Sequence, residues 1–83
     1  MSANVYWSPA TPKEGTSFNA GAPSSFISTL EQLTGSEMPL VIDGTSEFIR
    51  GAVAALALAE KGPWKELQSA LCKYGSVNIW AEY

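Results

Sequence analysis

The sequence contains no histidine and only one cysteine, Cys72. Histidine is the commonest general base and metal ligand in proteins, so its absence removes most routes to acid–base catalysis and to a zinc site. A single thiol cannot form an intrachain disulfide, and with no histidine to activate it we expect Cys72 to be a buried or partly buried structural thiol. The scattered carboxylates show no metal-ligand spacing. These absences predict no catalytic residues, no metal, no cofactor and no enzymatic activity.

Charged residues are also scarce, at 16% of the chain, and they sum to a net charge of −3. The five basic residues form no run, whereas binding to a nucleic-acid backbone needs clustered lysine and arginine. The composition therefore argues against nucleic-acid binding. A mildly acidic protein suits a protein partner with a basic surface, and a surface with so few charges often contains apolar contact patches.

No apolar run approaches the roughly 20 residues that a membrane-spanning helix needs; the longest covers residues 52–59. The first residues, Met1-Ser2-Ala3-Asn4, lack the basic and apolar regions of a signal peptide. Together with the single cysteine, these absences predict a cytoplasmic protein with no membrane association. The 83 residues and the hydrophobic fraction of 46% predict one compact domain over residues 1–83.

Residues 40–59 form the stretch around which the other segments can be arranged. Leu40-Val41-Ile42 is apolar without alternation, which is typical of a strand covered on both faces. A turn at Asp43-Gly44 follows, with Thr45 or Ser46 as the N-cap of a long helix. Apolar spacing and Pro/Gly punctuation along the whole chain predict helices over 25–34, 46–61 and 63–74, and strands over 3–7, 39–42 and 77–82.

The helix predicted over 46–61 is apolar nearly all round, which is typical of a buried helix. One of its sides carries small residues and could let another helix or a partner come close. For the core of the domain we expect six buried side chains: Ile42, Phe48, Val53, Leu56, Leu67 and Leu71.

The element order β-α-β-α-α-β predicts an α/β (α+β) fold, a two-layer sandwich in which the helices pack mainly on one face of a small three-stranded mixed sheet. A right-handed first crossover would make the first two strands parallel, and two helices before the last strand would make that strand antiparallel. The other face of the sheet would then be partly bare.

Alternation along the last strand predicts which side chains occupy that face. Val77, Ile79 and Ala81 share one side and are the best match to the helices. The pleat then places polar and aromatic side chains on the bare face, where exposed tryptophan and tyrosine are typical of binding hot spots. The candidate binding residues there are Tyr6, Asn78, Trp80 and Glu82.

Residues 8–25 form a loop rich in Pro, Gly and Ser, without helical or strand periodicity. Loops of this length in small domains are usually functional or mobile. Two interpretations remain open: a crossover loop pinned by Phe18, or a contact loop in which Phe18 is the binding anchor.

The segment Val41-Ile42-Asp43-Gly44-Thr45 resembles part of the haloacid-dehalogenase phosphatase motif, in which a strand ends in Asp-x-Asp-Gly-Thr. The nucleophilic aspartate of that family would fall on Val41, so the resemblance implies no phosphatase chemistry here. Backbone amides at Gly44–Ser46, at the start of a helix, could instead bind an anion or a nucleotide. The simpler interpretation is that Asp43 or Thr45 caps the helix.

These patterns favour a small acidic protein-interaction module or inhibitor that binds a larger protein and has no catalysis of its own. Inhibitors encoded by phages or mobile elements, such as anti-CRISPR proteins and antidotes, share this size and this lack of chemistry, an analogy of class only. The alternative is a homo-oligomeric structural or accessory subunit, for example a homodimer, that pairs through the sheet face or the edge strand. Binding of an anion or nucleotide at Gly44–Ser46 is the third hypothesis.

Overall fold

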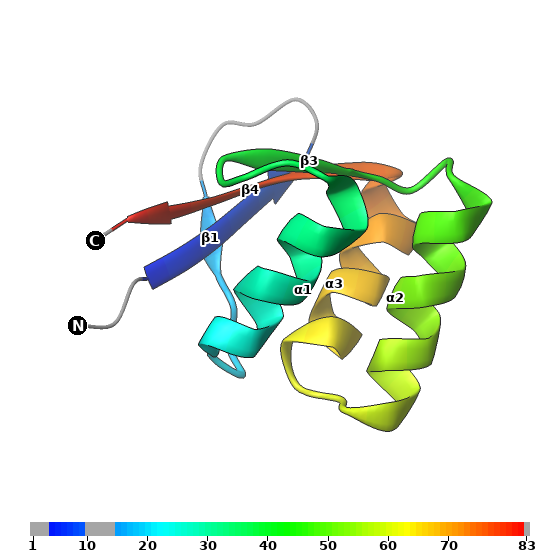
Figure 1. Cartoon of the computed structure of the whole chain (residues 1–83), viewed down its shortest axis with the longest axis horizontal. Coiled ribbons are helices and arrows are strands. Elements are labelled where there is room, and N and C mark those ends of the chain that lie inside the picture. The colour runs from blue at the N-terminus through cyan, green and yellow to red at the C-terminus, as the bar shows by residue number, and fades with distance from the viewer. Residues whose placement is uncertain (1–3, 10–14, 83) are drawn as a thin grey trace.

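The computed structural model describes residues 4–9 and 15–82. In this part of the chain the elements follow the order β1 (Asn4–Pro9), β2 (Thr16–Ser17), α1 (Ser24–Thr34), β3 (Leu40–Asp43), α2 (Glu47–Ala59), α3 (Pro63–Tyr74) and β4 (Ser76–Glu82), as Figure 1 shows. The six predicted elements are all present, and their ends differ from the prediction by one or two residues at most. The predicted strand residue Ala3, part of the predicted loop 8–25 and Tyr83 lie outside the described residues.

Local sequence signals set the helix boundaries. The hydroxyl of Ser46 accepts a hydrogen bond from the backbone N–H of Ile49 at 3.3 Å, so Ser46 is the N-cap of α2. Pro63 occupies the first turn of α3, where its missing N–H costs no hydrogen bond. Helices α1 and α3 end at Gly35 and Gly75, whose φ angles of 67° and 86° favour glycine.

The sheet has the strand order β2-β1-β4-β3, and every hydrogen-bonded pair in it is antiparallel. The α+β class is confirmed, but the prediction of a three-stranded mixed sheet is wrong. Strands β1 and β3 do run in the same direction, yet β4 lies between them and pairs with both. The fourth strand, β2, comes from the predicted loop 8–25 and has only two residues, too few for a period to be read from the sequence.

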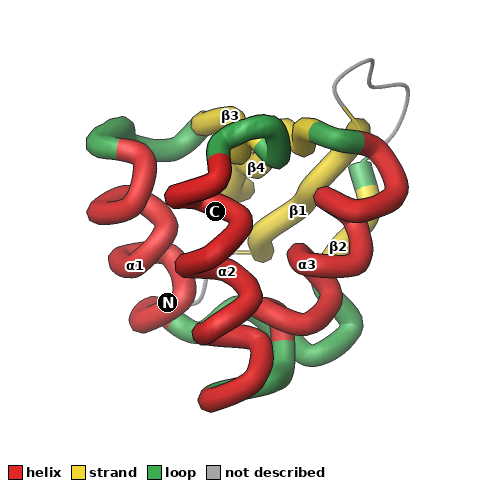
Figure 2. Tube along the Cα trace, turned by 90° about the vertical axis from the view of Figure 1, so that its right-hand side faces the viewer, coloured by secondary structure: helices red, strands yellow, loops and turns green. Residues whose placement is uncertain are grey.

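The hydrophobic core lies between the sheet and the helices, which all sit on one side of it (Figure 2). The predicted inward residues of β4 are confirmed: Val77 and Ile79 are fully buried and Ala81 packs against the core. Helices α1 and α3 contact the strands, whereas α2 packs chiefly on α3. Of the predicted core residues, those confirmed as buried are Ile42, Val53, Leu67 and Leu71.

The peripheral position of α2 explains the largest error in the predicted core. The buried strip of α2 is narrow and consists of Ile49, Val53 and Ala57. Phe48 lies on the opposite side with 70% of its surface exposed, so its predicted burial is wrong, and Leu56 is only half-buried. Because α2 is apolar all round, its sequence pattern could not indicate which strip faces the core.

Two further expectations, those for Val41 and Cys72, are corrected by the packing. Val41 is 55% exposed, so β3 is covered on one face only. Tyr74 is 42% exposed at the end of α3, although its ring still meets that of Trp7 at a centroid distance of 6.0 Å. Cys72 is exposed rather than buried, because it lies on the side of α3 that faces away from the sheet and toward α2.

Candidate protein-binding surface

The register of β1 and β4 creates an aromatic pair on the sheet face that lies away from the helices. Tyr6 and Trp80 are direct partners in the antiparallel ladder. Their rings stack with centroids 6.0 Å apart and an interplanar angle of 24°. Side chains alternate along a strand, so the neighbouring Val5 and Ile79 point into the core, and Tyr6 and Trp80 must point outward. We call this face the outer face and these two residues the aromatic pair.

Trp80 is held in place from three directions. The ring of Tyr6 covers one side, and the backbone of Gly15 lies so close to the indole that a β-carbon at Gly15 would overlap it. The indole N–H donates a hydrogen bond to Oε2 of Glu82 at 3.3 Å. Tyr6 and Trp80 are therefore half-buried rather than fully exposed, and the part of the indole that stays exposed has a fixed orientation.

The remaining outer-face residues form a mixed apolar and polar border to the aromatic pair. Asn78 lies opposite Val41 in the ladder, and its Nδ2 donates to the carbonyl of Pro9 at 3.0 Å. Glu82 is exposed at the end of β4. The outer face thus brings together four of the predicted binding residues, Tyr6, Asn78, Trp80 and Glu82, and adds Val41, which sequence reasoning had assigned to the interior.

Phe18 lies away from the outer face, inside the core. It is 5% exposed, and its ring meets that of Phe26 edge to face at 5.0 Å. Phe26 in turn contacts Trp64 edge to face at 4.7 Å. The backbone N–H of Asn19 donates to Oε1 of Glu66 at 2.9 Å, which fixes the same loop to α3. The described end of this loop, residues 15–25, is therefore pinned by Phe18, as in the first of the two interpretations, and Phe18 has no exposed ring to offer a partner.

The turn before α2 uses its own side chains to satisfy its amides. One carboxylate oxygen of Asp43 accepts both the N–H and the hydroxyl of Thr45, at 2.9 and 2.6 Å. These bonds, the hydroxyl first, hold the pKa of Asp43 below its ordinary value. The N–H of Ser46 donates to the Asp43 carbonyl at 3.3 Å. The amides of Thr45 and Ser46 are thus already engaged within the chain, which weakens the anion-binding hypothesis.

A second surface is the exposed apolar side of α2, for which the sequence predicted only that small residues could let another helix or a partner come close. Among residues 4–9 and 15–82, Leu58 and Phe48 are the most exposed large hydrophobic residues, at 82% and 70%. Gly51, Ala55 and Ala59 are also exposed on this helix. These small residues recur at every fourth position of the sequence, a spacing that fits a buried helix equally well.

Other site types find little support in the described part of the chain. Residues 4–9 and 15–82 contain no group of three or more cysteine or carboxylate side chains that could hold a metal ion. Within the same residues, no helix combines the length and the apolarity that crossing a bilayer requires.

No protein-family model, no curated protein and no solved structure matches this chain.

Proposed function

We propose that this chain is a small acidic protein-interaction module that acts by occupying a surface on a larger protein, without catalysis of its own. Inhibitors of the phage or mobile-element type, such as anti-CRISPR proteins and antidotes, act in this way. The observation that supports the proposal best is the stacked aromatic pair on a sheet face that no helix covers.

The aromatic pair has the properties of a binding hot spot. Tryptophan and tyrosine carry a large apolar area at a small cost in side-chain entropy, and they are enriched among residues that dominate interface energies. Contacts with Tyr6, Gly15 and Glu82 already fix the orientation of the Trp80 indole. Little further ordering is therefore needed when a partner binds, and preorganisation of this kind increases affinity.

The charge of the outer face favours a basic partner. Glu82 lies beside Trp80 on β4, and Asp43 is exposed at the end of β3. The whole chain carries a net charge of −3. A positively charged surface on the partner would complement these carboxylates, accelerate association and exclude acidic proteins.

Substitution of the aromatic pair tests the proposal directly. Trp80→Ala should cost about 1–2 kcal/mol of stability, because the indole is half-buried, and should leave the protein folded. We expect it to weaken partner binding by about 2 kcal/mol or more, which is roughly 30-fold. Partners captured from a cell lysate by the wild type would be identified by mass spectrometry, and each affinity would then be measured with the purified partner by calorimetry.

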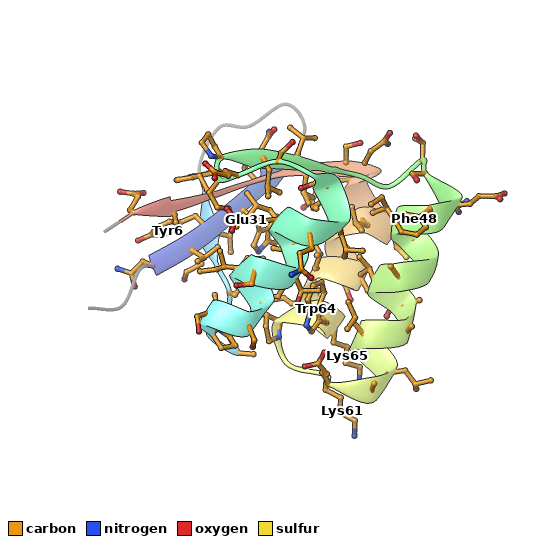
Figure 3. All side chains as sticks on the ribbon, in the orientation of Figure 1. Tyr6, Glu31, Phe48, Lys61, Trp64 and Lys65 are labelled. Carbon is orange, nitrogen blue, oxygen red and sulfur yellow. The ribbon has the colours of Figure 1, made fainter. Side chains whose placement is uncertain are left out.

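Phe48→Ala is the matched control, because Phe48 is an exposed aromatic residue that lies far from Tyr6 in Figure 3. It should leave the affinity unchanged. If Phe48→Ala abolishes binding and folded Trp80→Ala does not, the interface lies on α2 and the outer-face proposal is wrong.

A homo-oligomeric subunit is the second candidate, and the exposed side of α2 favours it. Phe48 and Leu58 lie ten residues apart, about 15 Å along the helix, and small residues separate them. Two copies of α2 packed antiparallel would place Phe48 of each against Leu58 of the other. Light scattering at increasing protein concentration tests this candidate. A self-associating chain should show the mass of a dimer at high concentration, and the Leu58→Glu variant should keep the mass of a monomer.

A further inference from the structure

Helices α2 and α3 run side by side (Figure 2), and residues of both helices line a groove between them. Two cavities lie along this groove, with volumes of about 430 and 330 Å³. Both are lined by Ala54 and Gln68, so they form one continuous groove. The first cavity extends toward Gly44 and Cys72, and the second toward the turn that joins the helices.

The floor of the groove is apolar and shallow. Val53, Ala54 and Ala57 line it from α2, and Leu71 lines it from α3. The alanines allow another backbone to approach closely, as small residues do where helices pack. Leu58 stands at the rim of the second cavity with 82% of its surface exposed. The groove can therefore bury apolar side chains of a ligand and cover Leu58 at the same time.

The rim of the groove is positively charged, although the chain is acidic. Arg50 lines the first cavity, and Lys61 and Lys65 line the second. In Figure 3 these two lysines lie together at the end of the helical layer that is remote from the sheet. Among the described residues, no aspartate or glutamate lines either cavity. Three of the five basic residues of a chain with net charge −3 thus border one groove.

The two charged ends are separated by a length that suits a short helix. Arg50 lies in the first part of α2 and Lys61 lies just beyond its last residue, Ala59; from Arg50 to Ala59 the helix rises about 14 Å, or two and a half turns. An amphipathic helix of that length carries apolar residues at i, i+4 and i+7 on the face that enters a groove, and its flanks remain free for charges.

We propose that the groove between α2 and α3 binds an acidic amphipathic helix of a partner protein. Its apolar face would cover the alanine floor and Leu58, and its carboxylates would pair with Arg50 at one end and with Lys61 and Lys65 at the other. A second copy of the chain does not suit this groove, because two grooves face to face would oppose like charges. The inference concerns a different surface from the outer face, so the two proposals succeed or fail separately.

A designed peptide serves as the probe. It is a fluorescein-labelled helix of about 14 residues with leucines along one face and glutamates on both flanks. A matched peptide carries lysine in place of every glutamate. At low salt we expect the protein to bind the acidic peptide at least tenfold more tightly than the basic one, measured by fluorescence anisotropy. The affinity should fall as salt is added, because exposed charges are screened.

Replacing basic residues at the rim of the groove with acidic ones gives the decisive variant. Arg50→Glu combined with Lys65→Glu should reverse the preference, so that the basic peptide binds more tightly. Far-ultraviolet circular dichroism verifies that the double variant is folded, because both substitutions make a chain of net charge −3 more acidic and an unfolded acidic chain would also prefer the basic peptide. Lys73→Glu is the matched control, since Lys73 is on the same helix but lies over the ring of Tyr74, outside the groove. It should retain the preference of the wild type, as should Trp80→Ala.

Cys72 reports the location of the bound peptide. It is the only cysteine and lines the first cavity, so saturating acidic peptide should slow its reaction with a neutral maleimide severalfold. Equal binding of the two peptides, or unchanged reactivity of Cys72 in the saturated complex, would overturn the proposal. Binding to phosphatidylglycerol vesicles without binding of the acidic peptide would also overturn it and would assign the groove to a lipid surface.

Discussion

At the scale of single residues, the absence of a side chain at Gly15 decides the geometry of the outer face. A methyl group there would overlap the indole of Trp80 and press on Tyr6. We expect Gly15→Ala to displace the indole, change the near-ultraviolet circular dichroism of the stacked rings and cost about 1–3 kcal/mol. Gly51→Ala is the matched control, because Gly51 is in the exposed interior of α2 with open space around it. It should stabilise the protein by up to about 1 kcal/mol, and an equal loss in both variants would contradict this account of Gly15.

The Asp43 carboxylate gives a second prediction at this scale. Hydrogen bonds from Thr45 lower the pKa of Asp43 in the folded state. The carboxylate therefore contributes its full stabilisation above the ordinary aspartate pKa of about 3.9, and this stabilisation disappears as the pH falls through the lower pKa of the folded state. Urea unfolding at about pH 6 and about pH 3 should therefore show the wild type losing its advantage over Asp43→Asn in acid. An advantage that is the same at both values of pH would show that the Thr45 bonds do not favour the charged form.

At the scale of the element, α2 buries one strip of side chains against the other described residues. Val53 lies in that strip and is 1% exposed, whereas Phe48 on the other side is 70% exposed. Val53→Ala should therefore destabilise the protein by about 2 kcal/mol. Phe48→Ala, which removes the larger side chain, should change stability by less than about 0.5 kcal/mol. Thermal unfolding of the two variants measures the difference, and a larger loss at Phe48 would mean that α2 is covered in solution.

At the scale of the whole molecule, the sequence predicted those features that depend on neighbours along the chain. Proline, glycine and Ser46 bound the helices, and alternation along β4 correctly separated Val77 and Ile79 from Trp80. Strand order and the exposed side of α2 depend on packing between distant segments. The central place of β4, the burial of Phe18 and the groove beside Arg50 therefore left no periodic signal in the sequence. Of the predicted binding residues, the four outer-face ones come together because all lie on β1 and β4, whose register aligns them.

The central place of β4 also determines when the sheet can form during synthesis of the chain. Ribosomes deliver β4 after every other element described here, yet β1 and β3 both depend on it for their main ladder of hydrogen bonds. Tyr6 meets its partner Trp80 only after 74 further residues have been joined, which takes about 4–15 s at the usual rates of synthesis. Helices α1 and α3 and the short β1–β2 pair can form during that interval, but the two ladders of β4 cannot. The nascent chain therefore spends seconds with β1 and β3 lacking their shared partner, and β4 then joins them in one late step.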